Sequence, residues 1–202
     1  MHQRWTFIIV ALLLISCATP YRPIIKDGSY TDPQFGISFS LPASWTVMDQ
    51  QPDWVKQHLN RIYVEPKLVL VSKNETCCII YTTGKLNVSA EDVNKHPEKL
   101  ESEIAVSIRR SIEKDKKNMH LIDYDYEVYP IKLEPGALTA IATIEETADF
   151  NHTRMTWTID SYLAPSVRKV KFVNLIYLSK DINSAPLKND YEALKASATV
   201  SP

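Results

Sequence analysis

Residues 36–45 read GISFSLPASW, and this stretch decides how the chain around it folds. Hydrophobic residues alternate with serines from Ile37 to Leu41, which is the period of two that buries one face of a β-strand. The turn residues PAS follow and lead into Trp45, so we expect a second short strand there, with the indole in the core. The stretch therefore predicts two strands joined by a turn.

Strand signals continue on the C-terminal side of this stretch. Residues 68–71 and 77–83 are apolar or β-branched runs separated by polar residues, which is typical of a hairpin. Further strands are predicted at 122–128, 138–144, 153–162 and 170–178, each after a polar or proline-containing turn. The chain is therefore expected to be rich in β-structure.

One long helix is predicted between these strands, at residues 97–117. Hydrophobic residues recur there every four positions, and charged residues occupy the rest of the helix surface. Pro97 suits the first turn, and Glu98 complements the positive end of the helix dipole. The residues expected to face a sheet are Leu100, Ile104, Ile108 and Ile112.

A shorter helix is predicted near the C-terminal end of the chain. Tyr191, Leu194 and Ala198 are spaced for one helix face, and Asn189 or Asp190 is expected to cap the N-terminus. The order strands, helix, four strands, helix favours an α+β domain, a mainly antiparallel β-sheet flanked by helices.

The two ends of this region resemble a known family. Residues 30–45, which read YTDPQFGISFSLPASW, are similar to the opening of PsbP-like proteins, in which GI-x-F-x-x-P-x-x-W forms the first hairpin. Residues 190–200, with Tyr191, Leu194 and Ser197, resemble the last helix of that family. The resemblance implies the Ran-release-factor/PsbP fold, which also occurs in bacterial lipoproteins, and binding or assembly work without catalytic residues. We assign this domain to residues 28–202.

The N-terminal 16 residues have the layout of a secretory signal peptide. Arg4 is followed by an apolar run that is shorter than the roughly 20 residues of a membrane-spanning helix. Residues 14–17, LISC, resemble the lipobox of bacterial lipoproteins, which are cleaved before the cysteine and acylated on it. We therefore predict that Cys17 carries diacylglycerol and an acyl chain such as palmitate, which hold the protein to a membrane.

This lipidation motif also predicts where the protein resides. By resemblance to lipoproteins of Gram-negative bacteria, Ala18 in place of an aspartate favours the outer membrane over retention in the inner membrane. Residues 17–27 include two prolines and show no periodicity, so we interpret them as a tether. The expected location is the bacterial cell envelope, with the domain facing the periplasm.

Composition and motifs argue against several functions. The formal net charge of −1 gives no support to nucleic-acid binding, and four glycines do not form a phosphate-binding loop. The histidines show no HxH or HExxH spacing, and there is no GxSxG nucleophile elbow. We therefore expect no cofactor, no metal site, no catalytic residues and no nucleic-acid partner.

Cys77 and Cys78 are adjacent in a predicted strand, so their side chains point to opposite faces and cannot easily bond to each other. We expect one thiol to be buried and the other to lie near the surface. A vicinal disulfide and a pairing with another protein are the alternatives in an oxidising compartment.

Two further groups of residues have alternative interpretations. Asp123, Asp125 and Glu127 share a strand face, which either attracts a cation or a basic partner or is a solvated outer face. The tryptophans Trp45, Trp54 and Trp157 either line a ligand groove or, for Trp45 and Trp157, pack in the core.

These observations predict a membrane-anchored envelope lipoprotein that acts as a non-catalytic binding or assembly factor with a protein partner. The first alternative is a module that binds a small ligand or a metal, and the second, less favoured one is a hydrolase. A broad exposed apolar patch favours a protein partner, a well-formed pocket favours a small ligand, and converging titratable groups favour an enzyme.

Overall fold

The computed structural model describes residues 24–59, 66–118, 120–150, 152–165, 169–180 and 184–200. The predicted signal peptide and the predicted lipidation site, Cys17, lie outside these residues. The described helices are α2 (Asp53–Leu59), α3 (Ala90–Lys95), α4 (Pro97–Asn118) and α5 (Ala185–Ala196). None of the helices within these segments is long and apolar enough to span a membrane.

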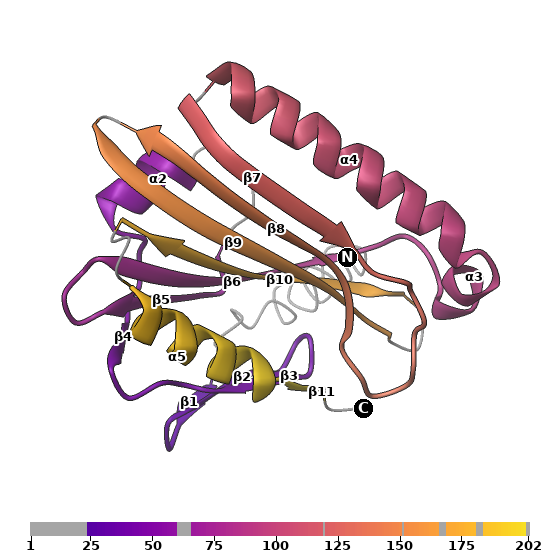
Figure 1. The fold of residues 1–202 in the computed structure, drawn as a ribbon. Helices are drawn as coiled ribbons and strands as arrows, with labels where there is room; N and C mark the ends of the chain where they lie inside the picture. Colours follow the sequence, from indigo (N-terminus) through magenta and orange to yellow (C-terminus); the bar gives the residue numbers. More distant parts are fainter. Residues whose placement is uncertain are drawn as a thin grey trace, which may run out of the picture.

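The larger of two sheets has seven strands in the order β4-β5-β6-β10-β9-β8-β7, and each pairing is antiparallel (Figure 1). Its strands are β4 (Trp45–Val47), β5 (Leu68–Ser72), β6 (Cys77–Lys85), β7 (His120–Val128), β8 (Thr139–Phe150), β9 (Thr153–Ala164) and β10 (Lys171–Ser179). The four strands after the long helix form a meander that joins the earlier hairpin through β10 and β6. The predicted strands and hairpin are confirmed.

The smaller sheet has four strands in the order β1-β2-β3-β11. They are β1 (Ile24–Lys26), β2 (Ser29–Asp32), β3 (Ile37–Ser40) and β11 (Thr199–Val200), and β1 falls within the stretch interpreted as a tether. Phe39 of β3 packs edge-on against Tyr81 of the larger sheet, with ring centroids 5.1 Å apart. The alternating residues of the GISFSLPASW stretch thus build the core between the two sheets.

Helices α4 and α5 lie on opposite faces of the larger sheet (Figure 1). Helix α4 crosses the β7 and β8 side of one face, where Ile108 and Ile112 are buried against Ala142. Helix α5 lies on the other face together with the smaller sheet, and it buries Tyr191 and Leu194 there. The predicted fold class, an α+β domain with antiparallel sheets flanked by helices, is confirmed.

The predicted cap of the last helix is wrong. Helix α5 begins at Ala185 after Ser184, with a proline in its first turn, because Pro186 supplies a helical backbone angle where no N–H is needed. Asp190 lies inside the helix and accepts a hydrogen bond from the indole N–H of Trp45, 2.9 Å away. This hydrogen bond therefore links Asp190 of α5 to Trp45 of β4.

Candidate functional site

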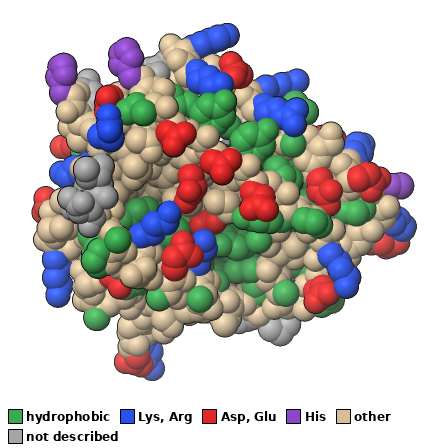
Figure 2. Space-filling model, in the orientation of Figure 1, with side chains coloured by type: hydrophobic (Ala, Val, Ile, Leu, Met, Phe, Trp, Pro, Cys, Tyr) green, Lys and Arg blue, Asp and Glu red, His purple; other side chains and the backbone are tan. Residues whose placement is uncertain are grey.

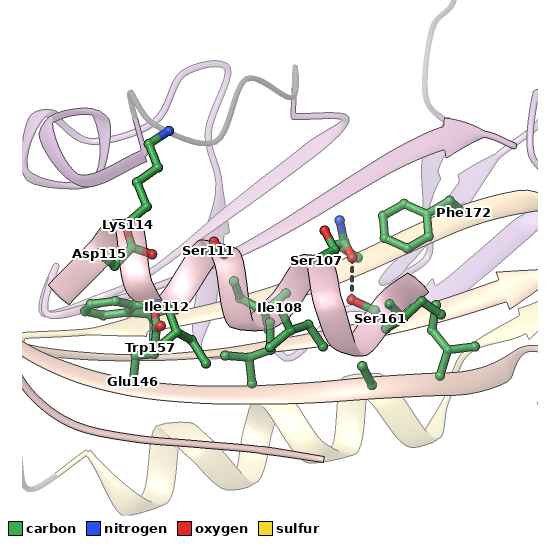
Figure 3. Close-up of a pocket in the computed structure, with 16 residues that line it drawn as sticks. Ser107, Ile108, Ser111, Ile112, Lys114, Asp115, Glu146, Trp157, Ser161 and Phe172 are labelled. Carbon is green, nitrogen blue, oxygen red and sulfur yellow. Dashed lines mark hydrogen bonds between the residues drawn. The ribbon is translucent and has the colours of Figure 1, made fainter. Parts of the chain in front are cut away.

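A groove of about 450 Å³ lies between α4 and the sheet face that this helix partly covers (Figure 3). One wall is α4, and the floor is made by β8, β9 and β10. Small-molecule sites in proteins usually enclose about 300–1,000 Å³, so this groove has the size of a ligand site.

Isoleucines from both sides make the groove apolar. The predicted stripe of α4 does face the sheet: Ile108 and Ile112 are buried, and Ile104 is half-buried. On the floor, Ile144 and Ile159 are paired across β8 and β9, and both remain partly exposed to the groove. Apolar surface that the fold leaves uncovered favours an apolar ligand.

The mouth of the groove is polar. Ser107, Ser111 and Asp115 recur every four residues along one side of α4, beside the isoleucine stripe. Opposite them, the hydroxyl of Ser161 donates a 2.8 Å hydrogen bond to Asn174, drawn as a dashed line in Figure 3. These groups offer hydrogen bonds to a ligand from both sides of the groove mouth.

Glu146 of β8 lies at the same end of the groove as Asp115 and Trp157 (Figure 3). Its side chain is only 5% exposed, and it is paired across the strands with Trp157, which donates a hydrogen bond to the carboxyl group. Burial, together with the negative charge of Asp115, raises the pKa of Glu146 to about 7. Near neutral pH the groove therefore contains a carboxyl group that readily gains or loses a proton.

Both adjacent cysteines are free and buried, so the prediction that one lies near the surface is wrong. Their strand, β6, is an interior strand whose two faces are both covered. The thiol of Cys77 lies 3.3 Å from the hydroxyls of Tyr177 and Ser179, between the sheets. Cys78 points to the other face, and burial raises the pKa of its thiol well above the ordinary value. Neither sulfur lines the groove.

The three acidic residues Asp123, Asp125 and Glu127 are exposed on β7, outside the groove. They point away from α4, because the alternate residues Tyr124 and Tyr126 contact that helix. Figure 2 shows carboxylates gathered in the middle of the face of the molecule that it presents. Within the described segments, no group of three or more histidine, cysteine or acidic side chains is arranged to hold a metal ion.

The tryptophans do not line one common groove. Trp45 and Trp157 are buried, as predicted for core residues, and Trp157 also lines the groove. Trp54 packs against the buried cluster on the sheet face that carries the groove, but it does not line the groove. The groove residues Glu146 and Asp115 were not predicted from the sequence. A detectable signal was the position of Glu146, which follows Ile144 by two residues and therefore shares its face of the strand.

No family model matches the chain, and no curated protein matches it in sequence. Among solved structures it is similar to LpqN of Mycobacterium tuberculosis, a protein involved in cell envelope biogenesis. The TM-score is 0.50 and the identity 14%, over 90% of each chain. The solution structure of cyanobacterial PsbP from Synechocystis also matches, with a TM-score of 0.45 and 10% identity, over 86% of this chain and 91% of the other.

A crystal structure from Bacteroides thetaiotaomicron matches with a TM-score of 0.47 and 12% identity, over 88% of this chain and 50% of the other. At such identities the likeness to LpqN concerns the fold and no residue-level function. The likeness in fold to LpqN extends over 90% of this chain.

Proposed function

We propose that this protein is a lipid-anchored envelope protein that binds a small, largely apolar molecule in the groove beside α4, without catalysing a reaction. The observation that carries the proposal is the groove of about 450 Å³, whose apolar floor stays uncovered in the folded domain. The exposed large hydrophobic side chains, in contrast, are spread over β1, the end of β4, α4 and β7. The structure therefore favours a small ligand over a broad protein-docking surface.

The anchoring part of the proposal rests on the LISC motif, which ends at Cys17. The likeness in fold to LpqN, which is described as involved in cell envelope biogenesis, supports a role in the envelope. A lipid anchor would hold the groove at the surface of a membrane, where apolar molecules accumulate. Anchor and groove are thus compatible parts of one binding function.

The groove favours binding over catalysis because of its side chains. Its lining, among the described residues, includes serines and carboxyl groups but no histidine or cysteine. The histidines whose side-chain burial is described, His96, His120 and His152, are exposed and do not line the groove. A serine nucleophile needs a base within hydrogen-bonding reach, and the lining offers no histidine for that role.

Filling the groove tests the binding function. We expect Ser111→Phe to weaken binding of a neutral apolar dye such as N-phenylnaphthylamine at least about tenfold, which corresponds to about 1.4 kcal/mol. Ser111 is exposed at the groove mouth, so the new ring enters the groove without displacing the core. Fluorescence titration of residues 17–202 with Cys17→Ser measures this, because no acyl chain then competes for the groove.

The matched control is Ser102→Phe, the same change at an exposed position of α4 outside the groove. We expect this variant to bind the dye as the parent protein does. Equal binding by all three proteins would place the dye elsewhere, and no binding by the parent protein would refute the proposed function.

A second prediction concerns the anchor. The protein extracted from its native membrane should begin at Cys17, and its intact mass should exceed that of chain 17–202 by a diacylglycerol and an acyl chain. The variant Cys17→Ser should lose the added mass and be recovered in the soluble fraction after cell lysis. An unmodified N-terminus after residue 17 in the native protein would contradict lipidation.

A further inference from the structure

We infer that the ligand of this groove is an organic ammonium compound, with an elongated apolar body and one positively charged amine bound between Asp115 and Glu146. The inference builds on the proposed function, because it names the chemical class that the same groove accepts. It rests on where the groove places its charges, its aromatic ring and its apolar floor.

The charges are concentrated at one end. Asp115 lies on the α4 wall and Glu146 on the β8 floor at the same end of the groove, closely enough for the charge of Asp115 to act on Glu146. The other charged residue of the lining, Lys114, is exposed and extends away from the groove (Figure 3). With both carboxyl groups ionised, this end repels an anionic ligand and attracts a cation.

The hydrogen-bonding capacity of these carboxyl groups and the aromatic ring beside them also suit an ammonium group. Carboxylates accept hydrogen bonds and an ammonium group donates up to three, so one amine can bond to both Asp115 and Glu146. The Trp157 ring lines the same end, and aromatic faces attract organic cations.

The rest of the groove accepts an apolar body. From the acidic end it passes Ile112 and Ile108 and reaches Phe172, with Ser161 at its side (Figure 3). An alkyl chain attached to the bound amine would lie along this apolar path. The ligand is therefore amphipathic, with its charge at one end.

The affinity for an amine should depend on pH. Glu146 lies in the groove beside Asp115 and Lys114, and no histidine is among the described lining residues, so we expect Glu146 to be the group that changes charge near neutral pH. Its pKa is about 7, so its ionised fraction increases about tenfold between pH 6 and 8. Amine binding should strengthen by a similar factor, and alcohol binding should change little.

The test uses three probes with the same chain: octylammonium, octanol and octanoate. Each is titrated into residues 17–202 with Cys17→Ser, and binding is followed by calorimetry and by displacement of the dye. We expect octylammonium to bind at least about tenfold more tightly than octanol, because a hydrogen bond between charged groups is stronger than one to a neutral hydroxyl. Octanoate should bind most weakly.

The variants Glu146→Gln and Asp115→Asn should each remove most of the preference for the amine over octanol. Asp123→Asn, which removes an exposed carboxylate outside the groove, should leave the preference for the amine unchanged. Equal affinity for amine and alcohol, or tightest binding of octanoate, would overturn the ammonium inference while the binding function stands. If neither the dye nor any probe binds, the proposed function itself fails.

Discussion

Replacing Asp160 with alanine is expected to lower the free energy of unfolding by about 3–5 kcal/mol, the cost of removing one partner from a buried ion pair. Asp160 of β9 is 3% exposed and accepts three hydrogen bonds. The donors are the hydroxyls of Thr143 and Tyr191, both at 2.6 Å, and the ammonium group of Lys195 at 2.9 Å. Two of these donors belong to α5, so Asp160 connects that helix to the sheet.

The protonation states of Lys195 and Tyr191 explain why Asp160→Ala is expected to cost so much unfolding free energy. Burial alone would lower the pKa of Lys195, but the hydrogen bonds to Asp160 and Glu192 raise it above the ordinary value. Burial and the charge of Asp160 raise the pKa of Tyr191 well above its ordinary value. The variant thus removes the common acceptor of a buried phenol and a half-buried amine, which keep, among the described residues, only the Leu175 carbonyl oxygen and the Glu192 carboxylate as acceptors.

Urea unfolding followed by circular dichroism measures the loss. The matched control is Asp149→Ala: Asp149 of β8 also forms an ion pair, with Arg154 at 3.3 Å, but its side chain is 47% exposed. Exposed pairs contribute about 0–1 kcal/mol, so this variant should stay close to the parent protein. A loss under about 1 kcal/mol for Asp160→Ala would show that the buried network does not hold α5 in place.

Glu146→Gln is expected to change how stability depends on pH. The pKa of this carboxyl group rises from the ordinary 4.5 to about 7 on folding, so the folded state favours the protonated form. The contribution of Glu146 is therefore complete below about pH 4.5 and is lost as the pH rises through about 7. The difference corresponds to about 3 kcal/mol of unfolding free energy between pH 4 and 8.

Glutamine has the same shape and does not ionise, so the variant should lack this loss. The unfolding free energy of the variant minus that of the parent protein should therefore increase by about 3 kcal/mol as the pH rises from 4 to 8. Glu145→Gln is the control, because Glu145 is the neighbouring residue of β8 but is exposed and bonded to Lys188. If the difference between Glu146→Gln and the parent protein did not vary with pH, Glu146 would not be the titrating group.

Much of the fold could be predicted because its long elements repeat hydrophobic residues with a clear period. The strand at Ile37 and the helix through Ile108 are examples, and each has the predicted face buried. The helices α2 and α3 were missed because they are only 7 and 6 residues long, too short for a periodic pattern to appear. The strand β11 has two residues and forms only because β3 is available as its partner.

The candidate site could not be predicted because it brings together residues that are distant in the sequence. Asp115 and Glu146 meet only when α4 packs across the sheet, and neither belongs to a recognisable motif. The local sequence did contain a warning, since Glu146 lies between Ile144 and Ala148 on a strand face that is otherwise apolar. A charged residue on a buried face breaks the usual pattern, and such breaks tend to mark functional positions.

The outer edge of the larger sheet affects how copies of this protein behave when they are crowded together. β7 is the last strand of that sheet, and the backbone N–H groups of Tyr124 and Tyr126 donate to the side chains of Asp123 and Asp125 at 2.9 and 2.8 Å. N–H groups two residues apart point to the same side of a strand, and here both are already bonded to side chains. An approaching strand would have to break these bonds and bring its backbone up to a row of negative charges, which opposes edge-to-edge aggregation. The lipid proposed on Cys17 would make such protection more important, because it would concentrate copies of the chain on a membrane, where they would meet far more often than in free solution.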